Sequence, residues 1–335
     1  MKMAGFVNMT KRVLVCGVGS IGRRHITNLL HLGAKVAVWR SQAHLLASVK
    51  EEFGVEVNED LNESIKLADA VVIATATDNH IPIAIKALEA GKALFIEKPL
   101  SNNWEGIEDL KHLSKGKIIE VGCQLRTHQN LIALSKLIQK KGVKNIFTYR
   151  LAMGHRLDAW RKEKDYQDGY SSDSGRGGGA LFDLIHQIDL ALWLFGPVVA
   201  VNADLSKRSD LNIKGDDVSN LLLTHSSGLT GHIQLDMASP IYRCEAEVMT
   251  SDSIFKWSYL KGILYNHSEN NTVIEDQVLE GFERNVLFKT HMAHFIKRLT
   301  DKTLPPLCSI DDGIAALRVA ICSREASIKG KKIII

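Results

Sequence analysis

Short apolar runs alternate with segments of helical periodicity over the first third of the chain. Five β-branched runs occur between residue 11 and about residue 122, and they are VLVCG, KVAVW, DAVVIAT, ALFIE and IIEVG. One separating segment, IPIAIKALEAG, ends in a glycine suited to the position after a helix. Strands that alternate with helices are typical of βα units, whose strands form a parallel sheet. An α/β domain is therefore predicted, with bounds of 9–126.

The pattern changes after residue 126. A helical segment, NLIALSKLIQKKG, precedes a polar, glycine-rich stretch and then several strand-like runs without helices between them, among them VVAVNADL, VSNLLLTHSSGLTGHIQLDMAS, RCEAEVMT and SIFKWSYL. Such runs indicate a mostly antiparallel sheet. Helical periodicity returns near the end, in VLFKTHMAHFIKRLT and DDGIAALRVAICSREASIKG. We expect an α+β domain with a large, mostly antiparallel open sheet over residues 127–335.

Composition narrows the class of protein. A chain of 335 residues is long enough for two cores. Its net charge of +4 is spread out, which argues against nucleic acid as a partner. The amino terminus lacks a signal-peptide pattern, and no run approaches the roughly 20 apolar residues of a membrane span. The five cysteines form no CxxC pair, and the histidines lack metal-ligand spacing. A cytoplasmic protein with reduced thiols and no metal is expected.

A glycine motif follows the first strand directly. In VLVCGVGSIGRRHITNLL, Gly17, Gly19 and Gly22 stand in G-x-G-x-x-G register at the start of a helix, with Ser20 and Ile21 between them. The three glycines permit a tight turn, close approach of the backbone to a pyrophosphate, and close packing of helix on strand. The helix N-terminus then faces the anion. The motif in this context predicts a Rossmann domain that binds NAD(P).

The end of the second strand bears on the choice of cofactor. That strand usually ends in an acidic residue that binds the ribose hydroxyls, but here KVAVW is followed by Arg40 and Ser41. An arginine can pair with a 2′-phosphate, and the serine adds a hydroxyl donor. NADP is therefore favoured over NAD, although an exposed surface arginine is the alternative interpretation.

These residues and two further motifs resemble the Gfo/Idh/MocA family, named for glucose-fructose oxidoreductase, inositol dehydrogenase and a rhizopine-catabolism protein. The run IATATDNHIPIAIKALEAGKALFIEKPLS contains Glu97-Lys98-Pro99, and GGGALFDLIHQIDLALWLFG is similar to the family's glycine-rich start of a helix with Asp and His. The resemblance covers essentially the whole chain. It implies a cofactor site that includes Glu97, Lys98 and, in the loop after the fourth strand, Thr75, Ala76 and His80.

The catalytic residues that the resemblance implies are Lys98, His186 and Asp183. Lys98 follows a parallel strand, where open α/β sheets bind ligands, and its ammonium can stabilise an alkoxide. His186 suits a general base, and Asp183 is expected on the same helical face because it lies three residues earlier. Much of the family has a spacing of four here, and a branch with the shorter form is associated with surface-polysaccharide sugar pathways.

Two further positions are predicted to contact substrate. Arg126 matches a family arginine near the domain junction, where a guanidinium can fork onto a hydroxyl, phosphate or carboxylate. The family's aromatic residue and proline after it are replaced by Thr127 and Gln129. Tyr166 lies in AWRKEKDYQDGYSSDSGRGGG, a polar segment with aromatic residues that is long enough to be a functional loop.

The resemblance implies hydride transfer between nicotinamide and a hydroxyl or keto carbon of a sugar, nucleotide sugar or polyol. Two other functions stay open at this stage. One is a glycosidase that uses transient oxidation and elimination with retained NAD, and the other is a non-enzymatic regulator that senses cofactor or sugar. Family members are often homodimers or homotetramers, so one face of the open sheet is expected to pair with a second subunit.

Overall fold

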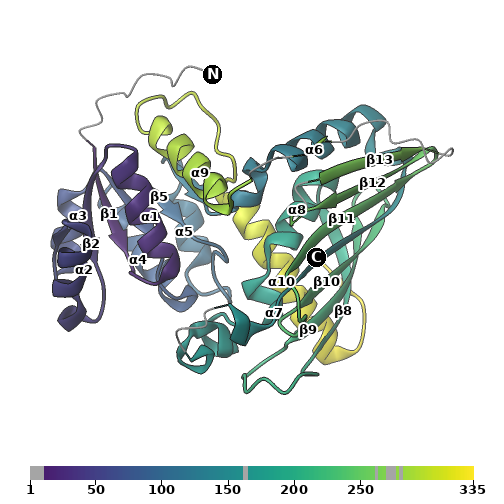
Figure 1. Cartoon of the computed structure of the whole chain (residues 1–335), viewed down its shortest axis with the longest axis horizontal. Coiled ribbons are helices and arrows are strands. Elements are labelled where there is room, and N and C mark those ends of the chain that lie inside the picture. The colour runs from purple at the N-terminus through teal and green to yellow at the C-terminus, as the bar shows by residue number, and fades with distance from the viewer. Residues whose placement is uncertain (1–10, 161–164, 261–262, 269–276, 279–281) are drawn as a thin grey trace. The chain divides into compact units, whose positions relative to one another are not determined.

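The computed structural model describes residues 11–160, 165–260, 263–268, 277–278 and 282–335 (Figure 1). The chain divides into two compact units, the first made of Met1–Gln124 and Arg284–Asp311, and the second of Leu125–Glu283 and Asp312–Ile335. The expected domain start at residue 9 and residues 161–164 of the polar segment lie outside the described residues. Among the helices that the structure describes, no single one is both long and apolar enough to cross a membrane.

The first unit contains a six-stranded parallel sheet in the order β3-β2-β1-β4-β5-β6. This is the strand order of a dinucleotide-binding Rossmann domain, and it confirms the predicted α/β fold. Its strands are β1 (Arg12–Cys16), β2 (Lys35–Trp39), β3 (Glu56–Val57), β4 (Ala70–Ile73), β5 (Ala93–Ile96) and β6 (Ile119–Val121). Its helices are α1 (Ser20–His31), α2 (Leu46–Phe53), α3 (Leu61–Leu67), α4 (His80–Glu89), α5 (Ile107–Leu113) and α9 (Arg284–Arg298).

Helix α9 joins the first unit although it lies far along the sequence. Its buried residues Met292, Phe295 and Ile296 belong to the same apolar core as the strand residues Val13 and Phe95. Removal of these side chains from water stabilises the arrangement by roughly 25 cal/mol per Å² of apolar surface. The domain boundary expected at residue 126 lies two residues from the observed break after residue 124. The expected division did not assign the later segment Arg284–Asp311 to the first unit.

The second unit contains a nine-stranded sheet in the order β14-β13-β12-β11-β7-β10-β9-β8-β15. Only the pairing of β7 with β10 is parallel among its described strands, which confirms a mostly antiparallel sheet. The strands are β7 (Ile146–Gly154), β8 (Val198–Ser206), β9 (Val218–His225), β10 (Thr230–Asp236), β11 (Arg243–Thr250), β12 (Ser253–Ser258), β13 (Ile263–Ser268), β14 (Gln277–Val278) and β15 (Ile333–Ile334).

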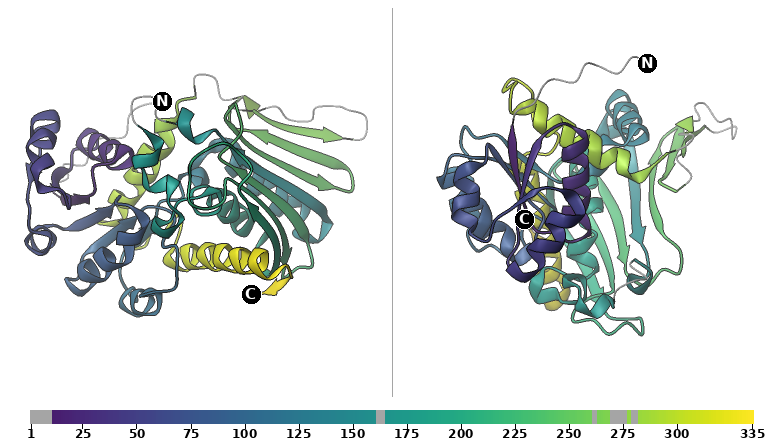
Figure 2. Two further views of the ribbon diagram at one scale, coloured as in Figure 1. Left: turned by 90° about the horizontal axis from the view of Figure 1, so that it is seen from below. Right: turned by 60° about the vertical axis from the view of Figure 1, so that its left-hand side comes forward.

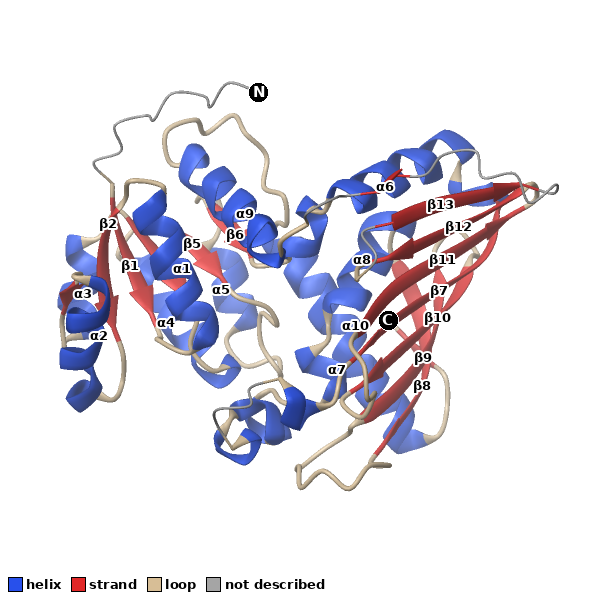
Figure 3. Cartoon of the chain, in the orientation of Figure 1, coloured by secondary structure: helices blue, strands red, loops and turns tan. Residues whose placement is uncertain are grey.

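Helices of the second unit gather on one face of this sheet (Figures 2 and 3). They are α6 (Gln129–Lys141), α7 (Ala180–Asp183), α8 (His186–Phe195) and α10 (Ile310–Lys329). Alternation along the strands explains the layering, because in β9 the side chains of Leu221 and Leu223 are buried whereas Leu222 is exposed. The apolar face of the strands is therefore the face that the helices cover.

Candidate functional site

The loop between β1 and α1 lies too close to the end of β4 for side chains at two of its glycines. Gly17 has a φ of +98°, and a Cβ there would stand 2.6 Å from the carbonyl oxygen of Ala74. A Cβ on Gly22 would stand 2.0 Å from the carbonyl oxygen of Gly17. At Gly19, by contrast, a Cβ would meet nothing within 4 Å, and the residue is exposed. The loop thus has open space at its middle glycine, where a ligand can approach the backbone.

The first turn of α1 suits an anion. Gly19 occupies the N-cap position without a side-chain cap, and the first turn contains no acidic residue. The N–H of Arg23 donates to the Gly19 carbonyl, so the helix itself supplies no acceptor for the N–H groups of Ser20, Ile21 and Gly22. A pyrophosphate is the ligand that such a helix terminus binds. The loop and helix therefore fit the diphosphate of a dinucleotide cofactor.

Two guanidinium groups come close at the end of β2. Arg40 follows that strand, and its Nη2 donates to the Oε1 of Gln42. Partial burial, and secondly the positive charge of Arg23, lower the pKa of the Arg40 guanidinium. Arg23 itself forms an ion pair with Glu52. Ser41 is exposed beside them. The arrangement concentrates positive charge and hydrogen-bond donors where the adenosine ribose of a Rossmann cofactor binds.

Lys98 stands at the carboxyl end of β5, with Glu97 buried behind it. The Oε2 of Glu97 accepts a hydrogen bond from the main-chain N–H of Lys98 at 3.3 Å. The Oε1 of Glu97 lies 2.7 Å from Nε2 of His25, a buried residue of α1. Burial opposes ionisation of Glu97, but the hydrogen bond and charge of His25 and the charge of Lys98 outweigh it and lower the pKa of this carboxyl.

His80 ties the loop after β4 to the segment after Lys98. Its ring is buried, with Nδ1 2.9 Å from the Pro99 carbonyl oxygen and Nε2 3.2 Å from the Thr75 carbonyl oxygen. Burial is the main cause that lowers the pKa of His80. The structure therefore gives its side chain a place inside the first unit, and a contact of this loop, with Thr75 and Ala76, to cofactor stays a prediction.

In the second unit, Asp216 fixes the start of α7. Its main-chain carbonyl accepts from the N–H of Ala180 at 2.9 Å, and its Oδ2 accepts from the N–H of Leu181 at 2.8 Å. Gly179 has a φ of +90°, and a Cβ there would stand 2.6 Å from Oδ1 of Asp216. Burial is the largest cause that raises the pKa of Asp216. The glycine-rich segment thus turns sharply against Asp216 and leads directly into the helix with Asp183.

The expected single helix through Asp183 and His186 is wrong. Asp183 is the last residue of α7, His186 is the first residue of α8, and the two helical segments meet at a bend of 51°. Tighter bonds cause the break, since the N–H groups of Ile185 and Gln187 donate three residues back, to Phe182 and Leu184. The spacing of three therefore does not place the two side chains on one helical face.

Two tyrosines of the polar segment have hydroxyl partners within the second unit. The hydroxyl of Tyr170 donates to Oδ1 of Asp183 at 3.3 Å. The hydroxyl of Tyr166 accepts from the N–H of Asn212 at 3.0 Å. The segment before the glycine-rich turn therefore reaches the predicted catalytic carboxylate through Tyr170, whereas Tyr166 is held by a different loop.

Comparisons with known proteins cover both units. A model described as "Oxidoreductase family, NAD-binding Rossmann fold" matches residues 11–123, and the "GFO/IDH/MocA C-terminal domain" matches residues 131–255. The scyllo-inositol 2-dehydrogenase (NAD(+)) of Bacillus subtilis (strain 168) is 30% identical over 271 residues, which cover 73% of this chain and 73% of that protein. The chain belongs to the Gfo/Idh/MocA family.

This Gfo/Idh/MocA protein is also similar to a second dehydrogenase sequence and to a solved dehydrogenase structure. The scyllo-inositol 2-dehydrogenase (NADP(+)) IolW of the same strain is 26% identical over 222 residues, which cover 64% of this chain and 60% of that protein. A solved structure of levoglucosan dehydrogenase in complex with NADH and levoglucosan has a TM-score of 0.85 at 20% identity, with 98% of this chain and 99% of that chain covered. The chain is an NAD(P)-dependent oxidoreductase that acts on CH–OH groups.

Arg126 of this Gfo/Idh/MocA oxidoreductase is held by a buried carboxylate. Its Nε donates to Oδ2 of Asp189 at 3.1 Å, and its Nη2 donates to Oδ1 at 2.7 Å. Its Nη1 lies 3.3 Å from Oδ2 of Asp312, and its guanidinium lies 6.0 Å from the ring centre of Trp193. The two donors of Arg126 that were expected to bind a substrate group therefore bind the Asp189 carboxylate. Direct contact of Arg126 with substrate stays a prediction.

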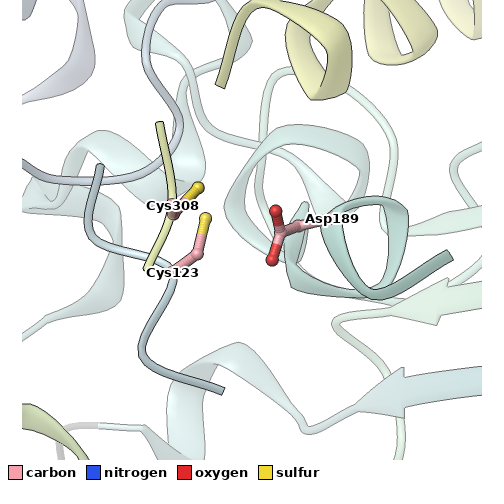
Figure 4. Close-up of side chains that lie close together, drawn as sticks. All are labelled: Cys123, Asp189 and Cys308. Atoms are coloured by element: carbon pink, nitrogen blue, oxygen red, sulfur yellow. The ribbon is translucent and has the colours of Figure 1, made fainter. Parts of the chain in front are cut away.

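Two cysteines of the first unit, Cys123 and Cys308, are neighbours in space (Figure 4). Their sulfur atoms lie within 4.8 Å of each other, and both residues are buried. Asp189, also drawn in Figure 4, belongs to the second unit, where it binds Arg126. Two thiols are fewer than the three or four protein ligands of a zinc site, so this pair by itself forms no complete metal site.

Sequence reasoning missed His25, and in the polar segment that it did expect to contact substrate it singled out Tyr166 and not Tyr170. His25 occupies a buried position of α1 next to Ile26, on the face that packs against the sheet. A polar residue at an apolar position of an amphipathic helix signals a buried partner, but the partner, Glu97, lies 72 residues away and could not be named. Tyr170 stood in a segment with several aromatic residues, and nothing in the pattern distinguished it from Tyr166.

Proposed function

We propose that this oxidoreductase transfers a hydride between NADP and a hydroxyl carbon of a sugar, nucleotide sugar or polyol. In this proposal His186 transfers the hydroxyl proton, and Lys98 assists that transfer. The observation that carries the proposal is the position of Lys98, which lies two residues after the end of β5, at the carboxyl end of the parallel sheet, and whose main chain is held by buried Glu97. Relatives named as inositol and levoglucosan dehydrogenases support a polyhydroxylated substrate.

In the oxidation direction the substrate loses a hydride from the carbon and a proton from the hydroxyl group of one CH–OH unit. The cofactor, when bound, supplies the acceptor for the hydride that leaves the carbon. His186 takes the hydroxyl proton as general base, and the ammonium of Lys98 stabilises the negative charge that develops on the oxygen. The products are a carbonyl group and a protonated His186, and in reduction each of these steps is reversed. Asp183, whose Oδ1 accepts from the Tyr170 hydroxyl, is the third catalytic residue of this proposal.

The preference for NADP is proposed from the charges at the end of β2. Arg40 and Arg23 are close enough for the charge of one to lower the pKa of the other, and no acidic residue follows the strand. A 2′-phosphate on the ribose would relieve this repulsion and accept from the guanidinium groups and from Ser41, whereas a free 2′-hydroxyl would not. Relatives include both NAD(+) and NADP(+) enzymes, so the chain's own residues support the choice.

Fluorescence titration of the purified protein with NADPH and with NADH tests this preference. Wild type is compared with Arg40→Ala and with Arg208→Ala, a surface arginine of the second unit that serves as the control. A hydrogen bond to a charged group contributes about 1.5–3 kcal/mol, so Arg40→Ala is expected to weaken NADPH binding by roughly 10- to 100-fold. NADH binding should change little. Equal losses for both cofactors would refute the preference.

Turnover with a panel of polyols, sugars and nucleotide sugars then tests the reaction itself. Formation of NADPH at 340 nm is expected for at least one member of the panel, and Lys98→Met and His186→Asn should each abolish it while NADPH binding persists. Full turnover in both variants would refute the assigned roles.

We also propose that the uncovered face of the nine-stranded sheet pairs with a second copy of the chain. Phe147, Leu222 and Met249 are exposed on described strands β7, β9 and β11 of this sheet, with exposed fractions of 62%, 46% and 36%. An exposed group of apolar residues on a regular sheet is typical of a subunit interface. Light scattering should report a mass above that of one chain, and Leu222→Arg should lower it. A monomer at micromolar concentration would contradict this proposal.

A further inference from the structure

A buried imidazole–carboxylate pair connects the helix of the glycine loop to the catalytic lysine. His25 lies on α1, three residues after Gly22, and both His25 and Glu97 are almost fully buried. The ring nitrogen Nε2 and Oε1 of Glu97 are 2.7 Å apart, and the second oxygen, Oε2, accepts from the N–H of Lys98 at 3.3 Å. One oxygen of the Glu97 carboxylate therefore binds the side chain of His25 on α1, and the other binds the main chain of Lys98 after β5.

The pair is enclosed on its other sides. A Cβ on Gly122 would stand 2.9 Å from Oε2 and 3.0 Å from Oε1 of Glu97, so the carboxylate rests directly against the main chain after β6. The His25 ring lies edge-on to Phe95, with centroids 5.3 Å apart, and to Phe288, at 6.4 Å. Within the part of the chain that the structure describes, Nδ1 of His25 is buried without a hydrogen-bond partner. Glu97 is therefore the group that this imidazole binds there.

We infer that His25 and Glu97 are positioning residues for Lys98: His25 fixes the Glu97 carboxylate, which in turn holds the Lys98 main chain and keeps a negative charge next to its ammonium group. This inference rests on the proposed role of Lys98 in proton work. Neither residue needs to touch substrate or cofactor. A lysine displaced by about 1 Å can lose roughly 100-fold in rate although the ligands still bind.

A second pair in the same unit provides a matched control. Nε2 of His291 lies 3.0 Å from Oε1 of Glu120, both residues are fully buried, and the His291 ring lies edge-on to Phe95 at 5.1 Å. Glu120 is further bound by Arg298, and the pair joins α9 to β6 rather than to Lys98. His291→Asn thus removes an equally buried imidazole from a carboxylate without a direct effect on the lysine.

Gly122→Ala offers a second perturbation of the first pair. The added methyl would displace the Glu97 carboxylate, the far end of a flexible side chain, while the charge of every group is kept. Because the polar residues are intact, this variant separates the position of the carboxylate from the presence of the imidazole. It also keeps the inference testable if His25→Asn fails to fold.

The experiment compares wild type, His25→Asn, Gly122→Ala and His291→Asn in three measurements. These are kcat and KM with the best polyol, the Kd for NADPH, and the rate at which acetic anhydride acylates Lys98 in the cofactor-free protein, followed by peptide mass spectrometry. His25→Asn and Gly122→Ala should lower kcat by roughly 10- to 100-fold and leave KM and Kd nearly unchanged. Lys98 should be acylated roughly threefold faster, because a main chain that the Glu97 carboxylate no longer holds leaves the lysine side chain more accessible to the reagent. His291→Asn should change none of these values.

The possible results separate this inference from the function on which it rests. If wild type transfers no hydride to any polyol, the proposed function fails, and the acylation rates still show whether the pair holds Lys98. If wild type is active but both His25→Asn and Gly122→Ala retain the kcat and acylation rate of His291→Asn, the positioning role is overturned. A rise in KM or Kd without loss of kcat would likewise overturn it, because it would mean that the pair shapes a binding surface.

Discussion

Replacement of Glu120 by alanine is expected to destabilise the first unit severely. Four donors converge on this fully buried carboxylate from α9 and the segment after it. They are His291 Nε2 at 3.0 Å, Arg298 Nη1 at 2.9 Å, and the N–H groups of Leu307 at 2.7 Å and Cys308 at 3.0 Å. Alanine would remove the counter-charge of the buried Arg298 guanidinium, which would keep two carbonyl acceptors, and would leave two main-chain donors without their acceptor. The attachment of Arg284–Asp311 to the sheet depends on these bonds.

The magnitude follows from the burial of the pair. Removal of one partner from a buried ion pair costs about 3–5 kcal/mol, and each unsatisfied main-chain donor costs about 1–3 kcal/mol unless water replaces the carboxylate. We expect a loss of at least about 3 kcal/mol in the free energy of unfolding, measured by urea denaturation with circular dichroism. Glu63→Ala is the control, because Glu63 forms a surface pair with Lys66 at 2.6 Å and should lose less than about 1 kcal/mol. Equal losses for the two variants would refute the reasoning.

The same carboxylate predicts how this difference depends on pH. Burial alone would raise the pKa of Glu120, but the hydrogen bond and charge of His291, the Cys308 N–H and the charge of Arg298 outweigh it and hold the pKa below its ordinary value. A carboxyl whose pKa is lower when folded stabilises the protein above its unfolded pKa of about 4.3. That contribution is lost as the pH falls through the lower folded value. The gap between wild type and Glu120→Ala should therefore be full at pH 6 and shrink below about pH 4.

Two further substitutions test the cofactor loop and the second unit. Gly22→Ala places a Cβ 2.0 Å from the Gly17 carbonyl oxygen, so the loop must move. We expect the variant to lose NADPH binding in a fluorescence titration and to keep its far-ultraviolet circular dichroism spectrum. Unchanged binding would contradict the close packing. Tyr170→Phe removes the hydroxyl that binds Asp183 at 3.3 Å. The kcat should therefore fall by roughly 10-fold, with little change in the Kd for NADPH. A kcat equal to that of wild type would show that this hydrogen bond has no part in turnover.

Local pattern was sufficient for the architecture of both units. The runs VLVCG, KVAVW, DAVVIAT, ALFIE and IIEVG correspond to β1, β2, β4, β5 and β6, because strands buried on both faces of a parallel sheet must be almost continuously apolar. The two-residue strand β3, at the edge, was too short to leave such a run. The glycine spacing located the loop at Gly17 because a positive φ and a 2.6 Å approach to Ala74 admit no side chain there.

Chain segments that meet only in three dimensions explain what the sequence did not indicate. The periodicity of α9 predicted a helix, but contacts made in three dimensions, such as that of Phe295 with Phe95, assign that helix to the first unit. Both buried imidazole–carboxylate pairs depend on this assembly, since the rings of His25 and His291 both lie edge-on to Phe95, in the strand that ends next to Glu97. A single aromatic residue of β5 thus contacts two pairs of the same chemistry, one that holds the main chain of Lys98 and one that joins α9 to β6. Loss of the second pair should therefore lower stability without a change in kcat, whereas loss of the first should lower kcat even where stability is kept.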